Sequence, residues 1–412
     1  MNTTPVNVTV IGGGMITHDQ ILPSLYHMQR RGEVGEISIC ALSSAPLRQL
    51  AGEPSFSEAF PGQSFTPYPE LDAPEDRNYP EIYRDVVADM PPGSLVVVAV
   101  PDQLHYEVIR FALDHDHHLL TVKPLVLTYS EAVEIEKTAL GKGLFVGVEY
   151  HKRFDRRSLE ARRQYRAGRL GEFRCGEAKL VEPWYYRHSN FQNWFTRENT
   201  DPFTYVGCHY VDLVWFITGL RPVEVSVRGV EGTFPNGNKG FLWAHGRVAW
   251  ENGALLGVLT GLGYPDEGAG TNDQGMVLYG EGPDCGTVIS HNDQYRGCSY
   301  GYSDKKDGAA FRFINPDYFR LVPGQEPGLK PVGYGFESIE ANVQAAIRVR
   351  GAGEDLEARR RIIREIDEKG IIATPANSSI NELVTEAVRL SILAEGKPAQ
   401  IDWTDEPSVK FS

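Results

Sequence analysis

The stretch that decides the fold of this chain is VNVTVIGGGMIT, residues 6–17. Its β-branched first half predicts a short strand, and the glycines that follow predict a tight turn into a helix. Glycine at Gly12 permits the turn, and glycine at Gly14 lets backbone amides approach a pyrophosphate. The third position of the G-x-G-x-x-G pattern is Thr17, so the pattern is incomplete and a plain tight turn is the alternative. We expect dinucleotide contacts here from Gly12, Gly14, Met15 and Ile16.

The first third of the chain alternates short apolar runs with helical patterns, which is typical of parallel strands joined by crossover helices. The range Gly52–Pro80, rich in Pro, Ser, Phe and acidic residues, predicts an irregular surface insertion. Residues 1–149 are therefore predicted to form a Rossmann NAD(P)-binding domain. The expected elements are strands at Val6–Ile11, Glu36–Leu42, Leu95–Val100, His118–Val122 and Leu144–Val148, and helices at Tyr106–His115 and Tyr129–Lys142.

Beyond Tyr150 the pattern changes to strands at hairpin spacing with few helices. Residues 150–412 are predicted to form a substrate-binding and oligomerisation α/β domain with a large open, mostly antiparallel sheet. The range Gly263–Pro331 predicts long hairpins and loops, and Asn377 or Ser378 could cap the last helix. The expected strands are Phe173–Leu180, Val223–Val230, Arg247–Trp250, Ala254–Leu262 and Met276–Gly280, and the expected helices are Asp155–Ala167, Ser338–Arg350, Glu357–Lys369 and Ser379–Glu395.

Composition narrows the classes of partner. The 412 residues carry a formal net charge of -14, which disfavours nucleic acid and anionic lipid as partners. The most apolar run, Leu95–Pro101, is far shorter than the roughly 20 residues that cross a bilayer, and the amino terminus lacks a secretory signal pattern. Five scattered cysteines without a C-x-x-C pair indicate neither a disulfide framework nor a metal site. We expect a cytoplasmic protein acting on a small polar molecule, and a homo-oligomer, dimer or tetramer, because an open sheet face needs cover.

The end of the second strand bears on the choice between NAD and NADP. An acidic side chain there would bind the adenosine ribose and exclude a 2'-phosphate, but the residues are Ser43 and Ser44, with Arg48 one turn later. Hydroxyls and a guanidinium suit a phosphate, so NADP is slightly favoured. The alternative is that Arg48 is simply an exposed, solvated side chain.

Further motifs follow in order along the chain, and together they resemble the Gfo/Idh/MocA family of glucose-fructose oxidoreductases and inositol dehydrogenases. The resemblance covers nearly the whole chain. Its parts are the glycine turn, Gln20–Pro23, the P-x-x-x-H of Pro101 to His105, Lys123-Pro124, Arg153-Phe154, Gly168–Gly171 and Gly207–Leu213.

The resemblance implies a nicotinamide cofactor across the Rossmann sheet, contacted also by Val100, Pro101, His105 and Lys123, and a carbohydrate facing the second domain. It implies that Lys123 orients the nicotinamide and the reacting hydroxyl, and that His209 takes the hydroxyl proton as hydride leaves. Oxidation of a secondary alcohol needs such a base. Considered without the family, Lys123 suits a solvated strand end and His209 a helical core.

Two departures affect the proton relay. Val122 stands where the family has an acidic residue before the lysine, and Tyr205 stands where it often has an aspartate four residues before the histidine. Tyr205 could donate a hydrogen bond or act as an acid, so it is also a candidate catalytic residue. It cannot hold a negative charge near neutral pH, since an unperturbed tyrosine has a pKa of about 10.

Two clusters are candidate substrate contacts. The basic run Tyr150, His151, Lys152 and Arg153 could receive a carboxylate or sugar hydroxyls, although interdomain salt bridges are the alternative. Aromatic and amide residues, Trp184, Arg187, Asn190 and Trp194 with Tyr205 and His209, suit the apolar faces and hydroxyls of sugars, although simple packing explains them as well.

We therefore expect an oxidoreductase of a sugar, sugar derivative or cyclitol that uses NAD or NADP. Three alternatives remain: a glycosidase or lyase that oxidises its substrate transiently with a tightly bound NAD, a cofactor-binding regulator, and a structural subunit. The presence of both Lys123 and His209 weighs against the regulator.

Overall fold

A computed structural model describes residues 4–268, 272–282, 285–292, 299–304, 308–313, 318–324, 327–404 and 406–411. The chain forms two compact units, which we describe separately. The first unit comprises Met1–Val126, Ser130–His151 and Phe319–Asn377, and the second Leu127–Tyr129, Lys152–Tyr318 and Ser378–Ser412. The division expected between residues 149 and 150 lies within two residues of the change of unit after His151. The later segment Phe319–Asn377 returns to the first unit because its helices complete that unit's core.

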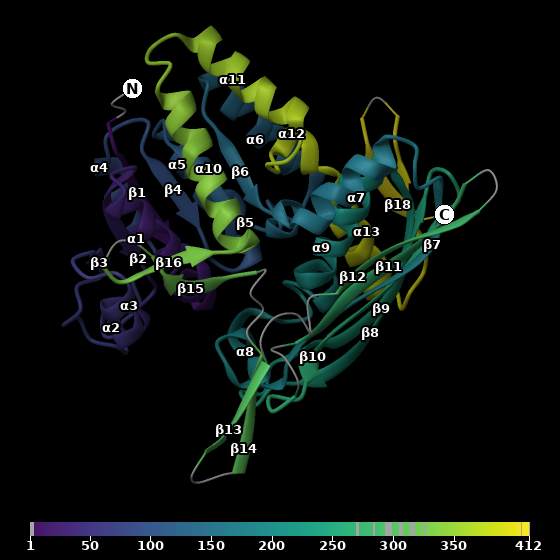
Figure 1. Cartoon of the computed structure of the whole chain (residues 1–412), viewed down its shortest axis with the longest axis horizontal. Helices are drawn as coiled ribbons and strands as arrows, with labels where there is room; N and C mark the ends of the chain where they lie inside the picture. The colour runs from purple at the N-terminus through teal and green to yellow at the C-terminus, as the bar shows by residue number, and fades with distance from the viewer. Residues whose placement is uncertain are drawn as a thin grey trace. The chain divides into compact units, whose positions relative to one another are not determined.

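The first unit is built on a parallel six-stranded sheet in the order β3-β2-β1-β4-β5-β6 (Figure 1). This order confirms the predicted Rossmann sheet. All four residues of β4 have no exposed surface, as is typical of a parallel strand covered on both faces. The strands are β1 (Val6–Ile11), β2 (Val34–Cys40), β3 (Thr66–Tyr68), β4 (Leu95–Val98), β5 (His118–Val122) and β6 (Val146–Glu149).

Helices cover both faces of this sheet, and three of the helical segments of this unit come from late in the chain. Ile339 and Val343 of α10 belong to the same buried core as Val8 and Val10 of β1. Figure 1 shows α10 lying along the sheet. The helical segments are η1 (Thr17–Ile21), α1 (Leu22–Arg30), α2 (Ser44–Ala51), α3 (Pro54–Ala59), α4 (Ile82–Asp89), η2 (Asp102–Leu104), α5 (His105–Asp114), α6 (Tyr129–Lys142), η3 (His151–Phe154), α10 (Tyr334–Arg350), α11 (Leu356–Lys369) and α12 (Pro375–Ser378), of which α6, η3 and α12 cross a unit boundary.

The range Gly52–Pro80 is mostly irregular and exposed, as expected, but two regular elements within it were not predicted. It contains α3, and β3 adds an edge strand that pairs with Ser38–Cys40 of β2. The strand is three residues long with Pro67 in its centre, so it has no visible alternation, and proline is tolerated because the strand lies at the edge.

The second unit is built on an eight-stranded sheet in the order β12-β11-β7-β10-β9-β8-β17-β18. Strands β7 and β10 are parallel, whereas the other neighbours are antiparallel, as predicted for most of the sheet. The strands are β7 (Glu172–Pro183), β8 (Pro222–Thr233), β9 (Lys239–Trp250), β10 (Leu255–Tyr264), β11 (Asp273–Glu281), β12 (Gly286–Asn292), β17 (Ala399–Asp402) and β18 (Ser408–Phe411).

One face of this sheet packs against helices, and the other carries exposed apolar side chains. Val211 and Val214 of α9 and Leu383 and Val388 of α13 share a core with the inward residues of the strands. Figure 1 shows these helices beside the sheet. The helical segments are α7 (Arg156–Arg166), η4 (Trp184–His188), α8 (Phe191–Trp194), η5 (Phe203–Gly207), α9 (Cys208–Thr218) and α13 (Ile380–Leu393).

Hairpins occupy much of the range Gly263–Pro331, as expected. They are β11 with β12, β13 (Ser299–Asp304) with β14 (Gly308–Phe313), and β15 (Arg320–Pro323) with β16 (Leu329–Val332). Residues 269–271, 283–284, 293–298, 305–307, 314–317 and 325–326 of that range lie outside the described residues. The expected cap of the last helix was wrong, because the residue at its start is Ser379, and Asn377 instead accepts a hydrogen bond from the Thr374 amide at 3.2 Å. In the described part of the chain, no helix is long and apolar enough to cross a membrane.

Candidate functional site

The glycine turn after β1 is shaped by contact with the neighbouring strand end. Gly12 has a φ of +117°, and a Cβ there would lie 2.0 Å from the carbonyl oxygen of Ala99. No other residue fits. Thr17, which replaces the third glycine of the pattern, is fully buried and donates its hydroxyl to the Gly12 carbonyl at 2.6 Å. The incomplete pattern is therefore compatible with an intact turn, because the hydrogen bond from Thr17 stabilises the turn.

Gly14, the second glycine of the pattern, has open space around it. A Cβ at Gly14 would meet nothing within 4 Å, so packing within the protein does not require glycine there. The open space lies beside the start of a helix that includes Met15 and Ile16. An anionic pyrophosphate fits such a position, because helix amino termini carry partial positive charge.

Arg48 is engaged by the protein. Its guanidinium donates to the carbonyl oxygens of Leu71 (2.5 Å) and Ala73 (2.6 Å), to the Ser44 hydroxyl (2.9 Å) and to the Glu75 carboxylate (2.8 Å). Ser44 is fully buried and itself donates to Ala73, whereas Ser43 is half-buried at the start of α2. Arg48 thus holds the loop after β3, a structural task that its sequence position did not reveal.

His105 supports the carboxyl ends of two strands. It has no exposed surface, and its ring nitrogens lie 2.9 Å from the Val100 carbonyl and 2.8 Å from the Pro124 carbonyl. It thereby joins the turn at Val100 and Pro101 to the turn that carries Lys123. These two turns follow neighbouring strands of the parallel sheet, β4 and β5. Because His105 has no exposed surface, its role is to support the two turns beside it.

In the second unit, a buried aspartate sets the start of the helix that carries Tyr205 and His209. Asp201 accepts hydrogen bonds from the amide and hydroxyl of Thr204 at 2.9 and 3.0 Å, and Arg389 pairs with it at 3.0 Å. Aspartate directly before Pro202 is a helix-start signal that can be recognised in the sequence.

Tyr205 lies within the π-helical segment η5, and His209 follows in the first turn of α9. Such π-helical turns occur frequently at functional sites. His209 is 5 % exposed and Tyr205 is half-buried.

Arg153 serves the interior of the second unit. Its guanidinium binds both carboxylate oxygens of Asp212, at 2.8 and 2.5 Å, and Asn381 donates to the same carboxylate at 2.9 Å. Arg153 and Asp212 are each 1 % exposed. This bidentate pair ties the segment after β6 to α9 and α13, so the geometry favours a structural role for Arg153 over substrate binding.

Lys152 lies among polar and aromatic groups of the second unit. Its ammonium donates to the side-chain oxygen of Gln274 at 2.6 Å and stands 5.3 Å from the ring centroid of Tyr210, while the Tyr210 hydroxyl reaches the same oxygen at 3.4 Å. Tyr210 is the residue after His209. Gln274, on the helix-facing side of β11, was not predicted, since its role depends on strand register. Tyr150 and His151 belong to the first unit, where Tyr150 is 2 % exposed.

The predicted aromatic cluster forms within the second unit. Tyr205 lies among three rings, with centroid distances of 5.2 Å to Phe191 and 5.7 Å to both Trp194 and Phe195. Packing therefore accounts for part of this cluster, although Trp194 keeps some exposed surface.

The rest of the predicted aromatic loop is more open. Trp184 is 46 % exposed, and the Arg187 guanidinium stands 3.9 Å from the centroid of its ring. Asn190 is exposed and accepts from Asn193 at 2.9 Å. An exposed indole with a cation against one face leaves the other face available for stacking.

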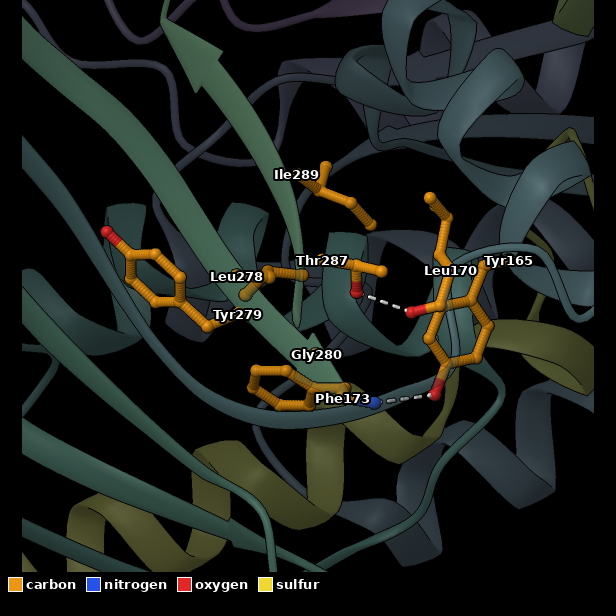
Figure 2. A pocket seen from close by; sticks show the side chains of 8 residues that line it. All are labelled: Tyr165, Leu170, Phe173, Leu278, Tyr279, Gly280, Thr287 and Ile289. Carbon is orange, nitrogen blue, oxygen red and sulfur yellow. Dashed lines mark hydrogen bonds between the residues drawn. The ribbon is translucent and has the colours of Figure 1, made fainter. Parts of the chain in front are cut away.

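A small cavity of about 10 Å³ lies near the Gly168–Gly171 motif (Figure 2). Figure 2 shows Thr287 donating to the Leu170 carbonyl at 2.6 Å and the Phe173 amide donating to Tyr165 at 3.2 Å. A Cβ on Gly171 would lie 2.1 Å from the Glu281 carbonyl. The cavity holds at most about one water molecule, so this motif is a structural corner and not a substrate site.

Family models match both units. A model described as an oxidoreductase family with an NAD-binding Rossmann fold matches residues 6–150, and a model described as the GFO/IDH/MocA C-terminal domain matches residues 158–282. The chain belongs to the GFO/IDH/MocA family. This confirms the resemblance, and it agrees with the parallel sheet and the glycine turn described above.

Relatives of this GFO/IDH/MocA protein include dehydrogenases named for carbohydrates. An uncharacterized oxidoreductase of Schizosaccharomyces pombe is 36% identical over 24% of this chain and 27% of its own length. The D-glucoside 3-dehydrogenase of Escherichia coli is 24% identical over 54% of this chain and 57% of its own length. Each match thus spans less than two thirds of the relative.

Solved structures share the fold across the whole chain. The inositol dehydrogenase homolog from Azotobacter vinelandii, complexed with NADH and myo-inositol, has a TM-score of 0.63 and 18% identity, covering 96% of this chain and 98% of that chain. At this identity the likeness shows the fold of the GFO/IDH/MocA protein alone.

Proposed function

We propose that this protein is an NAD(P)-dependent oxidoreductase that moves hydride between the nicotinamide and a secondary alcohol or carbonyl of a sugar, sugar derivative or cyclitol. The observation that carries the proposal is the presence, in a GFO/IDH/MocA chain, of both Lys123 and His209, the residues expected to act on the reacting hydroxyl. Lys123 directly follows β5 at the carboxyl end of the parallel sheet, and His209 stands in the first turn of α9. Ligands of open α/β sheets bind at this edge.

The residues of the first unit fit a dinucleotide. Gly12 brings the turn against β4, and the open space at Gly14 accepts a pyrophosphate. Val100 and Pro101 line the same edge and are half-buried, while His105 holds them in place. When bound, the nicotinamide supplies the hydride acceptor or donor.

Side chains of the protein then act on the reacting hydroxyl and its proton. The Lys123 ammonium orients the reacting hydroxyl and stabilises negative charge on its oxygen. The His209 imidazole accepts the hydroxyl proton during oxidation and returns it during reduction. Tyr205, without a carboxylate's charge, can assist only by hydrogen bonding, and the aromatic surface of Trp184 and Trp194 suits one face of a sugar ring.

The preference between NAD and NADP is decided by contacts near α2. The sequence favoured NADP because of Arg48, and here the Arg48 guanidinium is paired with the Glu75 carboxylate and bonded to Ser44 and to the loop carbonyls. A 2'-phosphate would have to compete with the Glu75 carboxylate for this guanidinium. We therefore expect use of both cofactors.

The exposed face of the second sheet supports self-association. Registered pairs place Val288, Tyr279, Cys175 and Leu255 in one row across four strands, and three of these side chains, Val288, Tyr279 and Leu255, are 56 %, 58 % and 38 % exposed. A second copy of the chain would cover such a row. Analytical ultracentrifugation tests this: the Tyr279→Glu variant should sediment as a smaller species than the wild type.

The function itself is tested by following absorbance at 340 nm with a panel of sugars and cyclitols and with NAD and NADP. Stoichiometric release of NAD(P)H with at least one polyol is the expected result. Turnover of a glycoside without net NAD(P)H would instead support transient oxidation, and cofactor binding without any turnover would support a regulator.

A further inference from the structure

A carboxylate lies beside the position where the family's acidic residue is missing. Strands β5 and β6 pair in parallel with Val122 opposite Glu149. Paired residues on neighbouring strands point to the same side of a sheet, and the strands lie about 4.8 Å apart. Glu149 is 3 % exposed. The acid absent before Lys123 is thus present one strand away, on the same face.

Glu149 connects two segments of the first unit. One carboxylate oxygen accepts from Gln20 at 2.8 Å, and the other accepts from Nδ1 of His151 at 2.8 Å. Gln20 is fully buried in η1, within the helix that begins at the glycine turn, and it also donates to the Gly335 carbonyl at 3.0 Å. His151 stacks on Tyr334 with ring centroids 5.7 Å apart.

The charge of Glu149 is maintained by these partners. Burial raises the pKa of the Glu149 carboxyl, but the charge and hydrogen bond of His151 and the hydrogen bonds of Gln20 and Ser338 outweigh burial and leave that pKa below its ordinary value. An ionised carboxylate only accepts hydrogen bonds. The neighbouring groups must therefore donate, which fixes the orientation of the Gln20 amide and keeps a proton on Nδ1 of His151.

We propose that Glu149 is a positioning residue for cofactor binding and hydride transfer, which takes over from β6 the task of the acid missing at Val122. It holds the helix of the glycine turn, through Gln20, in a fixed position relative to the ends of β5 and β6. Lys123 follows β5 directly, so the same contacts set the position of this lysine relative to the pyrophosphate-binding turn. This inference rests on the proposed function for its kinetic part only, because cofactor affinity is measured without a substrate.

The decisive change is Glu149→Gln. An amide has the shape of the carboxylate, but its NH₂ group would face a donor, either Gln20 or His151, so one contact is lost. We expect the dissociation constants of NAD and NADP to rise roughly tenfold, the effect of one charge-assisted hydrogen bond. Glu134→Gln is the matched control, since Glu134 is an exposed acid of α6. This control variant should bind NAD and NADP with the affinity of the wild type.

Rescue distinguishes positioning from simple packing. Val122→Glu placed in the Glu149→Gln background returns a carboxylate to the same face and should recover most of the lost affinity and turnover. If this double variant does not fold, Glu149→Asp decides, because its shortened carboxylate should give an affinity between those of the wild type and Glu149→Gln.

Two results would overturn the inference. The first is a Glu149→Gln variant with a lower Tm but normal cofactor affinity. The second is a folded double variant that does not recover cofactor affinity or, where the double variant does not fold, a Glu149→Asp variant whose affinity is no higher than that of Glu149→Gln. If no polyol is oxidised by the wild type, the proposed function fails, whereas the binding measurements still decide the role of Glu149.

Discussion

The indole of Trp194 stands edge-on to the phenol of Tyr205, with ring centroids 5.7 Å apart and an interplanar angle of 68°. The two side chains come from α8 and from the helix of His209. Any substrate held against Trp194 would therefore lie near a ring anchored on that helix.

Trp194→Ala should raise KM for the polyol substrate several-fold and leave cofactor affinity unchanged, because Trp194 belongs to the second unit and the dinucleotide turn to the first. Loss of its contacts with three aromatic neighbours should also lower Tm. Steady-state kinetics and calorimetric binding of NAD provide the test. Trp184→Ala serves as the control for the effect on Tm, because Trp184 is 46 % exposed and its side chain should contribute less to packing. Unchanged KM in the Trp194 variant would assign this residue to packing.

His209→Asn should lower kcat by roughly 100-fold to 10,000-fold, because asparagine cannot accept the hydroxyl proton. Cofactor binding should persist. Stopped-flow measurement of NADH formation separates the chemical step from product release. Tyr205→Phe is the companion variant, and its effect should be much smaller. A His209→Asn protein that melts earlier but turns over normally would contradict the assignment.

Arg48→Ala should lower the free energy of unfolding by about 1 to 3 kcal/mol, because the loop at Leu71–Glu75 loses its donors. We expect the ratio of NAD to NADP affinity to change little. Urea denaturation and paired binding titrations measure the two effects. A selective loss of NADP affinity would restore the role that the sequence favoured.

Asp155 should make stability sensitive to acid. Burial raises the pKa of Asp155, but hydrogen bonds from His291 and Arg157 outweigh burial and hold that pKa at about 2. Because the folded pKa lies below the unfolded value of about 3.9, the stabilisation is complete above pH 4 and is lost as pH falls toward 2.

The size of this contribution is about 2 kcal/mol. Asp155→Asn should therefore lower the free energy of unfolding near neutral pH, and the difference from the wild type should shrink between pH 4 and pH 2. A difference that stays constant over this range would show that Asp155 acts by capping α7 alone.

Local patterns predicted the regular elements well. The bounds of β1, β5 and α6 match the expected ranges to the residue, because apolar alternation and helix periodicity are local properties. Strand β9 begins at Lys239, eight residues before the expected start, since Gly240 and Gly246 interrupt the β-branched pattern.

The candidate site was less predictable, because its contacts join distant parts of the sequence. Arg153 and Asp212 pair across 59 positions, and Gln20 and Glu149 across 129. The sequence indicated these residue types but not their partners. Register does reveal some of them, as the pairing of Val122 with Glu149 shows.

The return of Phe319–Asn377 to the first unit has a consequence for biosynthesis. Ile339 and Val343 of α10 complete the core around Val8 and Val10, yet a ribosome translates them only after nearly all of the second sheet. Part of the apolar face of the nascent amino-terminal sheet therefore stays uncovered until α10 has been synthesised, although domains generally fold as units during synthesis. A chaperone that binds apolar surface would have its longest opportunity on this segment, and a ribosome stalled before residue 339 would carry a dinucleotide-binding sheet that lacks one of its covering helices.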